Sequence, residues 1–375
     1  MSLHSRTALC AVAPVALRSS NSPISTQELT SENKHYLELD GLRGVAALSV
    51  ALFHLQHFYG GQSFFGHGYL AVDFFFMLSG FVLMHAYGER LASRDTLAPY
   101  LRDRAIRLYP MLIIGAVIGF GFAYITREQT SLSLAFIIAA SAVNAAGLPA
   151  IWSKNPFWIN GPTWSLFFEV VASVLFGLLA YSITTRRIIL VAGLSAFLML
   201  VLNHHVGLFG FGWTRKTMAA GFVRVCASFA IGLILQRLHS AGMLANGGKR
   251  WWVAPVLVAS FLFLPTYSEH SVFYDPAVVF GLYPLLILAS AGSQDLYPSI
   301  SKLSGALSYP FYVVHIPLLS LIEHYLVTFG VKLNGWTASS SLIASLAISW
   351  VLLRYYDEPV RTYLRRRFGS RRHRG

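Results

Sequence analysis

The sequence contains little charge. Only 12% of its residues are Asp, Glu, Lys or Arg, whereas soluble globular domains carry about 25%. Hydrophobic residues make up 55% of the chain. This balance excludes an ordinary soluble domain and is typical of a helical protein that crosses the membrane several times.

Cysteines and acidic residues are also scarce. The two cysteines, Cys10 and Cys226, form neither a disulfide framework nor a metal-binding motif, and we expect no bound metal. The 16 acidic and 29 basic residues give a formal net charge of +13. The basic residues cluster between apolar segments and at the C-terminus, as in loops that face an anionic cytoplasmic leaflet. We therefore expect the lipid bilayer, and no nucleic acid, as a partner.

About eleven apolar segments approach the length of a transmembrane helix. They are 42–59, 68–87, 109–125, 132–147, 163–181, 188–206, 217–238, 251–267, 273–290, 304–329 and 336–355. The basic clusters between them, which include Arg90 and Arg94, can all be cytoplasmic only if one segment does not cross. The best candidate is 132–147, which is short and contains Asn144 among small residues. A re-entrant segment is allowed where it is buried in protein.

The sequence thus predicts an all-α, polytopic integral membrane protein. It has about ten transmembrane helices, a re-entrant segment at 132–147, both termini in the cytoplasm and no appended soluble domain. Residues 1–36 are rich in Ser, Thr and Asn, and predict a disordered tail, with a targeting segment as the alternative. A membrane domain over 37–360 and a basic cytoplasmic tail over 361–375 follow.

Two ionisable residues share one face of the first apolar segment. Arg43 and His54 are eleven residues apart, which is about three helical turns and about 16 Å. Ionisable groups within a membrane helix are costly, so they are functional candidates. The pair indicates a ligand with an anionic head and a reactive end one extended arm away. The alternatives are an arginine that snorkels to the membrane surface and a histidine packed between helices.

The predicted topology places further ionisable side chains near the depth of His54. They are Asp73, Glu169, Arg224 and His315. A charge at this depth must be paired or solvated. Asp73 or Glu169 can orient the imidazole, or either can pair with Arg224. The tryptophans Trp152, Trp158 and Trp164 favour either a platform for a sugar or an interfacial aromatic belt.

Seven motifs occur in order along the chain. They are Arg43 and His54 around LDGLRG; GYLAVDFFFMLSGFVL with Asp73; Arg102, Arg104 and Arg107 before Tyr109–Pro110; TWSLFFE with Glu169; Arg224 with Phe229 and Gly232; LSGALSYPFYVVHIP with Tyr309 and His315; and Glu358–Pro359. Over about residues 39–359 the chain resembles the membrane acyltransferase 3 family, which O-acylates bacterial surface polysaccharides and some macrolides. The long N-terminal tail departs from the family pattern. The outer esterase-like domain of some relatives is not expected here.

The resemblance implies acyl-CoA, above all acetyl-CoA, as a co-substrate on the cytoplasmic side of a bacterial inner membrane. It implies a carbohydrate, glycolipid or macrolide-like hydroxyl as acceptor, and no permanently bound cofactor. Arginines bind phosphates through bidentate, charge-assisted bonds. We therefore expect Arg43, Arg102, Arg104 and Arg107 to hold the donor, although the last three also explain the topology.

An imidazole can take a proton from a hydroxyl near neutral pH. We expect His54 to be the general base, supported by Asp73 or Glu169. A nucleophilic His54, and hence an acyl-enzyme, stays open. Arg224, Tyr309 and His315 are expected to line the site, although a core histidine also explains His315.

Two other classes of protein fit part of this pattern. A transporter or flippase of lipid-linked or polysaccharide substrates also has buried charges and a re-entrant segment. It does not need a phosphate-binding arginine aligned with a proton acceptor. A scaffold subunit of a polysaccharide synthase needs no buried charges. We predict a membrane O-acyltransferase, and leave the acceptor, the acyl chain length and the oligomeric state open.

Overall fold

The computed structural model describes residues 36–59, 65–88, 91, 96–206, 209–242, 248–262 and 271–369. No strand occurs in these ranges, and helices account for most of them. The predicted N-terminal tail up to residue 35, Arg90, Arg94 and the last six residues lie outside the described residues.

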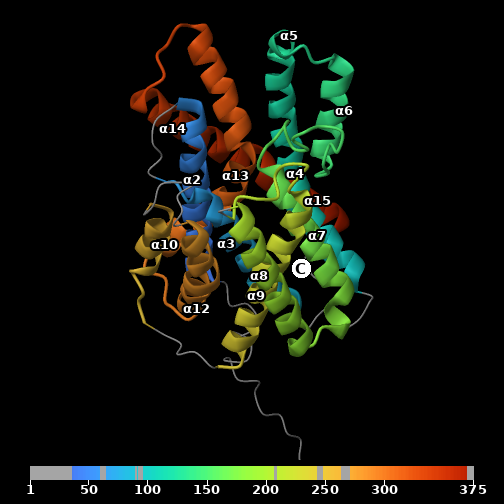
Figure 1. Ribbon diagram of the computed structural model, residues 1–375, viewed down its shortest axis with the longest axis vertical. Coiled ribbons are helices and arrows are strands. Elements are labelled where there is room, and N and C mark those ends of the chain that lie inside the picture. The colour runs from blue at the N-terminus through green and yellow to red at the C-terminus, as the bar shows by residue number, and fades with distance from the viewer. Residues whose placement is uncertain are drawn as a thin grey trace, which may run out of the picture. The chain divides into compact units, whose positions relative to one another are not determined.

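Figure 1 shows the helices in chain order. The longer ones are α2 (Leu37–Tyr59), α3 (Ala71–Tyr87), α4 (Leu97–Ile125), α6 (Leu134–Ala145), α7 (Thr163–Leu179), α8 (Thr185–Val206), α9 (Met218–Ser240), α10 (Val253–Leu262), α12 (Tyr283–Ala291), α13 (Pro298–Thr328), α14 (Gly335–Leu352) and α15 (Glu358–Phe368). The short ones are η1 (Gly68–Leu70), α5 (Arg127–Thr130), η4 (Ala180–Ser182), α11 (Ser271–Pro276), η5 (Ala277–Leu282) and η6 (Leu353–Asp357).

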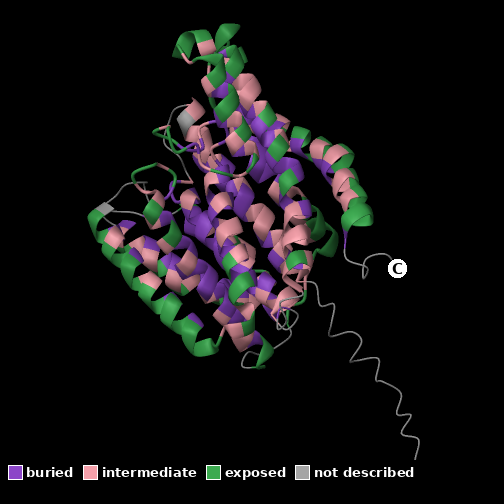
Figure 2. Cartoon of the chain, turned by 90° about the vertical axis from the view of Figure 1, so that its right-hand side faces the viewer, coloured by how far each residue is buried: buried purple, intermediate pink, exposed green. Residues whose placement is uncertain are grey.

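Eight helical segments of the described chain are long and apolar enough to cross a membrane. The exposed face of α8 supports this assignment, because Leu190, Leu194 and Phe197 on it are 61–63% exposed. Such an exposed apolar surface suits contact with lipid. Buried residues fill the middle of the bundle (Figure 2). The prediction of an all-α polytopic membrane protein is confirmed.

Three of the predicted segments are helical but fall outside these eight. They are α2, which is long enough at 23 residues but carries polar side chains, and the shorter α6 and α10. At 12 residues, α6 is shorter than the about 20 that a span needs. The buried amide of Asn144 donates to the carbonyl oxygens of Leu148 and Pro156, both at 3.0 Å. The amide thus fixes the loop that follows α6 against the helix end.

The helix that carries Arg43 and His54 packs closely along α13. A Cβ atom at Gly44 would lie 1.9 Å from Ser304 Oγ, so only glycine allows this approach. Ser304 Oγ donates to the carbonyl oxygen of Gly41 at 3.0 Å. His54 contacts His315 further along both helices, so α2 and α13 run in the same direction. The two helices therefore bring their polar residues together at matching heights.

A second close contact joins α3 to α9. A Cβ atom at Gly80 would lie 2.2 Å from the Phe229 carbonyl oxygen, and one at Gly232 would lie 2.0 Å from that of Met77. The backbones of the two helices therefore almost touch. This approach places Asp73 of α3 opposite Arg224 of α9, in the middle of the bundle.

Candidate active site

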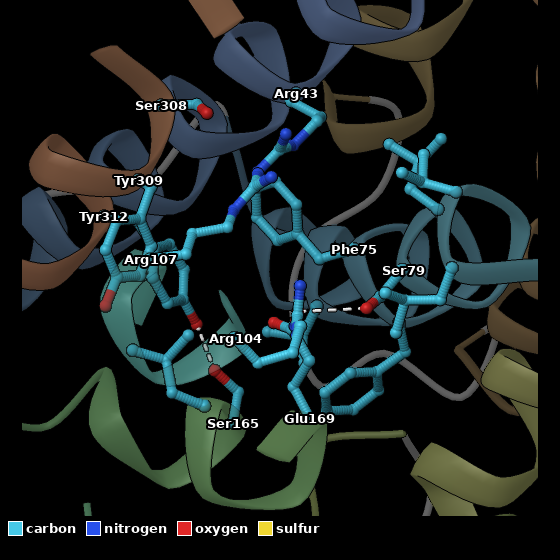
Figure 3. A pocket seen from close by; sticks show the side chains of 16 residues that line it. Arg43, Phe75, Ser79, Arg104, Arg107, Ser165, Glu169, Ser308, Tyr309 and Tyr312 are labelled. Atoms are coloured by element: carbon cyan, nitrogen blue, oxygen red, sulfur yellow. Dashed lines mark hydrogen bonds and ion pairs between the residues drawn. The ribbon is translucent and has the colours of Figure 1, made fainter. Parts of the chain in front are cut away.

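Two cavities lie between the helices and meet at Val72 and Tyr312, which line both. The first, called here the arginine cavity, has a volume of about 70 Å³ and is lined by Arg43, Val72, Phe75, Ser79, Arg104, Arg107, Ser165, Glu169, Ser308, Tyr309, Tyr312 and nearby apolar residues (Figure 3). The second, called the histidine cavity, has a volume of about 330 Å³ and is lined by Val50, Phe53, His54, Tyr69, Val72, Asn155, Phe157, Trp158, Gly161, Pro162, Trp164, Gly210, Trp213, Arg224, Tyr312 and Ile316. The part of α2 around Arg43 thus contributes to the arginine cavity, and the part around His54 contributes to the histidine cavity.

Arg104 is held in place within the arginine cavity. Its Nη2 lies 2.9 Å from Oε1 of Glu169 and 3.3 Å from Oγ of Ser173. Ser79 Oγ donates to the same Glu169 oxygen at 3.0 Å. Glu169 therefore neutralises Arg104 and fixes the direction of its guanidinium group.

Arg43 and Arg107 are held much less firmly than Arg104. Their side chains point toward one another, and Arg43 exerts the largest electrostatic effect on Arg107 (Figure 3). Arg43 reaches Asp40 only at 3.5 Å. Within the described residues, Arg107 makes no hydrogen bond or ion pair of its own. Three arginines and one glutamate line this cavity, so it has an excess of positive charge that suits an anionic ligand.

Arg102 is not among the lining residues of either cavity. Its predicted role in donor binding stays a prediction, but it does not share the cavity with Arg104 and Arg107. Residues 104 and 107 are three positions apart and share a helix face, whereas residue 102 is two positions from 104 and faces elsewhere.

The hydrogen bonds of His54 assign its tautomer. Its Nδ1 lies 2.9 Å from the carbonyl oxygen of Val50 and 3.3 Å from Nε2 of His315. A carbonyl oxygen only accepts, so we assign the proton of His54 to Nδ1 and the lone pair to Nε2. His315 Nδ1 lies 2.8 Å from the Tyr312 carbonyl oxygen. By the same reasoning His315 carries its proton on Nδ1, and its Nε2 accepts from His54.

Asp73 does not orient His54, and that prediction is wrong. Its carboxylate accepts from Arg224 at 2.7–3.1 Å and from Ser228 at 3.1 Å. Both members of the Asp73–Arg224 pair are buried, at 0% and 1% exposure. A buried carboxylate needs a countercharge, and the alternative prediction of an Asp73–Arg224 salt bridge is confirmed.

The remaining hydrogen bonds of Arg224 connect two segments that border the histidine cavity. Its Nη2 donates to the Tyr69 carbonyl oxygen at 2.9 Å, and its Nη1 donates to that of Phe211 at 3.2 Å. Arg224 is therefore a lining residue, as predicted, with its charge already compensated by Asp73.

Glu169 lies in the arginine cavity and binds neither His54 nor Arg224. Both predicted partnerships are wrong for this residue. Counting residues from a helix end estimates depth but not tilt or rotation, and α7 directs Glu169 toward α3 and α4. Tyr309 lines the arginine cavity, while His315 is not a lining residue and contacts His54 from behind.

Aromatic side chains surround much of the histidine cavity. Trp158 and Trp164 line it, as the sugar-platform interpretation requires, but Trp152 is 47% exposed and does not. Sequence reasoning did not identify Trp213, which comes from the loop before α9. The only local signal is its position among glycines in FGFGWTR.

Sequence reasoning also did not identify Tyr312 and gave Ser165 no role. The Tyr312 hydroxyl lies 2.6 Å from Ser165 Oγ where the cavities meet. Tyr312 stands three positions before His315, a spacing that places both on one helix face and is a usable signal. In the described part of the chain, no group of three or more His, Cys, Asp or Glu side chains is arranged to hold a metal ion.

The fold and the two cavities define a helical membrane protein with a charged chamber beside an aromatic one. The chain belongs to the acyltransferase 3 family, whose model, described as an acyltransferase domain, matches residues 36–354. The protein is therefore a membrane acyltransferase that transfers groups other than amino-acyl groups. A protein described as protein 2 in the picA locus of Rhizobium radiobacter is 31% identical over 186 residues, which are 46% of this chain and 96% of that protein. No solved structure matches the chain.

Proposed function

We propose that the protein is an O-acyltransferase of the bacterial inner membrane. It moves an acyl group, preferably acetyl, from acyl-CoA at the arginine cavity to a hydroxyl of a carbohydrate at the histidine cavity. The observation that carries the proposal is that the two cavities meet at Val72 and Tyr312 and that α2 supplies Arg43 to one and His54 to the other.

The charge of the arginine cavity supports a phosphate-containing donor. Arg43 and Arg107 face each other and repel, so an anion between them would relieve the repulsion and make charge-assisted hydrogen bonds. Phosphates of coenzyme A have the right charge. At about 70 Å³ the cavity is far smaller than the about 300 Å³ of a pocket for a drug-sized ligand. We therefore expect the nucleotide at the mouth and the narrow thioester arm inside.

The distribution of basic residues supports a cytoplasmic arginine cavity. The first turn of α8 carries Arg186 and Arg187, and α9 ends near Arg237, which donates to the Ile183 carbonyl oxygen at 3.1 Å. These segments lie at the same end of the bundle as Arg104, and basic loops prefer the cytoplasmic side. On this orientation both the C-terminal helix α15 and the donor face the cytoplasm.

The histidine cavity suits an uncharged sugar. Trp158, Trp164 and Trp213 offer flat apolar surfaces on which the C–H face of a pyranose ring can pack. Arg224 contributes no net charge, because Asp73 compensates it. A volume of about 330 Å³ is at the lower end of the range for small-molecule pockets, which is enough for the acylated end of a glycan or glycolipid.

The chemistry follows from the tautomer of His54. The acceptor O–H gives its proton to Nε2 as its oxygen attacks the thioester carbonyl carbon. The carbon–sulfur bond then breaks, and the imidazolium returns the proton to the leaving thiolate. The products are an O-acyl ester and coenzyme A thiol, and no further reactant is needed.

Label transfer in membranes tests this proposal. Membranes of cells that express the chain are incubated with radiolabelled acetyl-CoA, and both thiol release and label in the glycan and glycolipid fraction are measured. We expect His54→Gln to lower both by about 10²–10⁴-fold. His205→Gln, an exposed histidine at the end of α8, is the matched control and should match the wild type. Equal rates for wild type and His54→Gln, with equal amounts of protein inserted, would exclude the assignment.

A further inference from the structure

We propose that His315 is a positioning residue, which orients the imidazole of His54 by accepting a hydrogen bond at its Nε2. In this role His315 replaces the carboxylate that often orients a catalytic histidine. This inference rests on the proposed function, in which His54 is the base. It differs from the sequence prediction, which gave that task to Asp73 or Glu169.

Three hydrogen-bond contacts fix the relative position of the two rings. His54 Nδ1–H lies within reach of the Val50 carbonyl oxygen and of His315 Nε2, at 2.9 and 3.3 Å. His315 is itself anchored by its Nδ1–H, which donates to the Tyr312 carbonyl oxygen at 2.8 Å. His315 is 0% exposed, so its ring cannot turn toward water. Its only lone pair therefore faces His54.

This pair suits a membrane interior better than a carboxylate would. A buried carboxylate needs a countercharge, as Asp73 needs Arg224. A neutral imidazole accepts the same hydrogen bond without placing a net charge in the bundle. When His54 becomes an imidazolium, its Nδ1–H becomes a charged donor and the bond to His315 strengthens. The pair thus stabilises the charged form of His54 at the moment of catalysis.

The same geometry prevents the proton from leaving through His315. The His315 Nδ1–H ends on a backbone carbonyl oxygen, which cannot pass a proton onward. The proton on His54 must therefore return through Nε2. This agrees with transfer back to the thiolate and distinguishes the pair from a proton relay.

Two substitutions distinguish the hydrogen bond that His315 accepts at Nε2 from the one that it donates from Nδ1 to Tyr312. His315→Gln places an amide at the position of Nε2 and keeps an acceptor toward His54. His315→Asn places an amide at the position of Nδ1, so it keeps the bond to Tyr312 and loses the acceptor. We expect His315→Asn to lower kcat for acetyl transfer about 10–100-fold with an unchanged KM for acetyl-CoA, and His315→Gln to stay within about threefold of the wild type. A merely structural histidine would instead favour Asn, or tolerate both.

A second measurement does not depend on activity. In the full chain with ¹⁵N-labelled histidine, solid-state NMR identifies the His54 signal by its loss in His54→Gln. We expect the Nδ1–H tautomer, and a shift of its Nδ1 signal in His315→Asn. An Nε2–H tautomer, or an Nδ1 signal that His315→Asn leaves in place, would overturn the inference. Normal turnover by His54→Gln would instead overturn the proposed function, so the two failures are distinguishable.

Discussion

The hydroxyl of Tyr312, which lines both cavities, lies 2.6 Å from Oγ of Ser165, which lines the arginine cavity. A single hydrogen bond contributes about 1 kcal/mol, so the junction between the two cavities can open when an acyl group arrives. On the proposed function the acyl group passes Tyr312, and a longer chain must displace the tyrosine ring, so we expect short chains to be preferred.

Removing the tyrosine ring should therefore broaden donor specificity. We expect Tyr312→Ala to raise the ratio of butyryl to acetyl transfer at least about threefold, because the space of the ring becomes available to extra methylenes. Competition between butyryl-CoA and acetyl-CoA in membranes measures the ratio. Tyr312→Phe keeps the ring and is the control. A ratio that stays constant in Tyr312→Ala would show that the junction does not select chain length.

The arginines should separate into three groups by donor titration. Loss of one charge-assisted bond costs about 1.5–3 kcal/mol, so Arg43→Ala and Arg107→Ala should raise KM for acetyl-CoA about ten- to a hundredfold. Arg43→Lys should recover only part of this, because an ammonium lacks the planar fork. Arg102→Ala should leave KM unchanged, since Arg102 does not line the cavity. A KM that is unaltered in both Arg43→Ala and Arg107→Ala would contradict donor binding there.

Arg104→Ala has a different expected effect. It removes the partner of Glu169 and leaves that carboxylate in the half-buried cavity. We therefore expect lower thermal stability in addition to weaker donor binding. The double variant Arg104→Ala/Glu169→Gln should regain part of the stability and none of the binding.

The Asp73–Arg224 pair should be structural rather than catalytic. Breaking a buried ion pair by removing one partner costs about 3–5 kcal/mol, so Asp73→Ala or Arg224→Ala should leave little folded protein. The double variant Asp73→Leu/Arg224→Met should be more stable than either single variant. Heating in detergent followed by size-exclusion chromatography measures this. Stable, folded Asp73→Ala with no turnover would instead point to a direct role in the chemistry.

The proposed orientation predicts which loops a membrane-impermeant maleimide can reach. Single cysteines are introduced at the exposed positions Lys154 and Thr184 after Cys10 and Cys226 are replaced by serine. In intact sphaeroplasts, Lys154→Cys should react with the maleimide, whereas Thr184→Cys should react with it only after lysis. The opposite pattern would place the arginine cavity on the outer side and exclude cytoplasmic acyl-CoA as its ligand.

The helices could be predicted from sequence because apolar runs of sufficient length have few alternatives in a bilayer. The Arg43–His54 pair could be predicted because both residues belong to one helix, whose pitch fixes their separation. The choice between the alternative partners of Asp73, and the actual partner of Glu169, could not be predicted. They depend on the rotation of α3, α7 and α9, which hydropathy does not specify.

The proposed role of His315 could not be predicted from sequence for a related reason. The depth of His315 in the membrane predicts that it lies near His54. Which nitrogen of each ring carries the proton follows only from the hydrogen bonds to the carbonyl oxygens of Val50 and Tyr312. Backbone acceptors carry no signature in the sequence. Trp213 lies in a loop, where no periodicity indicates direction.

Gly44 has no side chain, yet through its contact with Ser304 it affects the geometry of the proposed site. Gly44 is ten positions, or about 15 Å along the helix, from His54 and touches neither cavity. Yet it sets the distance between the two helices that carry His54 and His315. A methyl group at position 44 would push these helices apart and lengthen a hydrogen bond that is already 3.3 Å. On the proposed function, the alignment of His54 as the base thus depends on a contact near the opposite end of α2, where a side chain is absent.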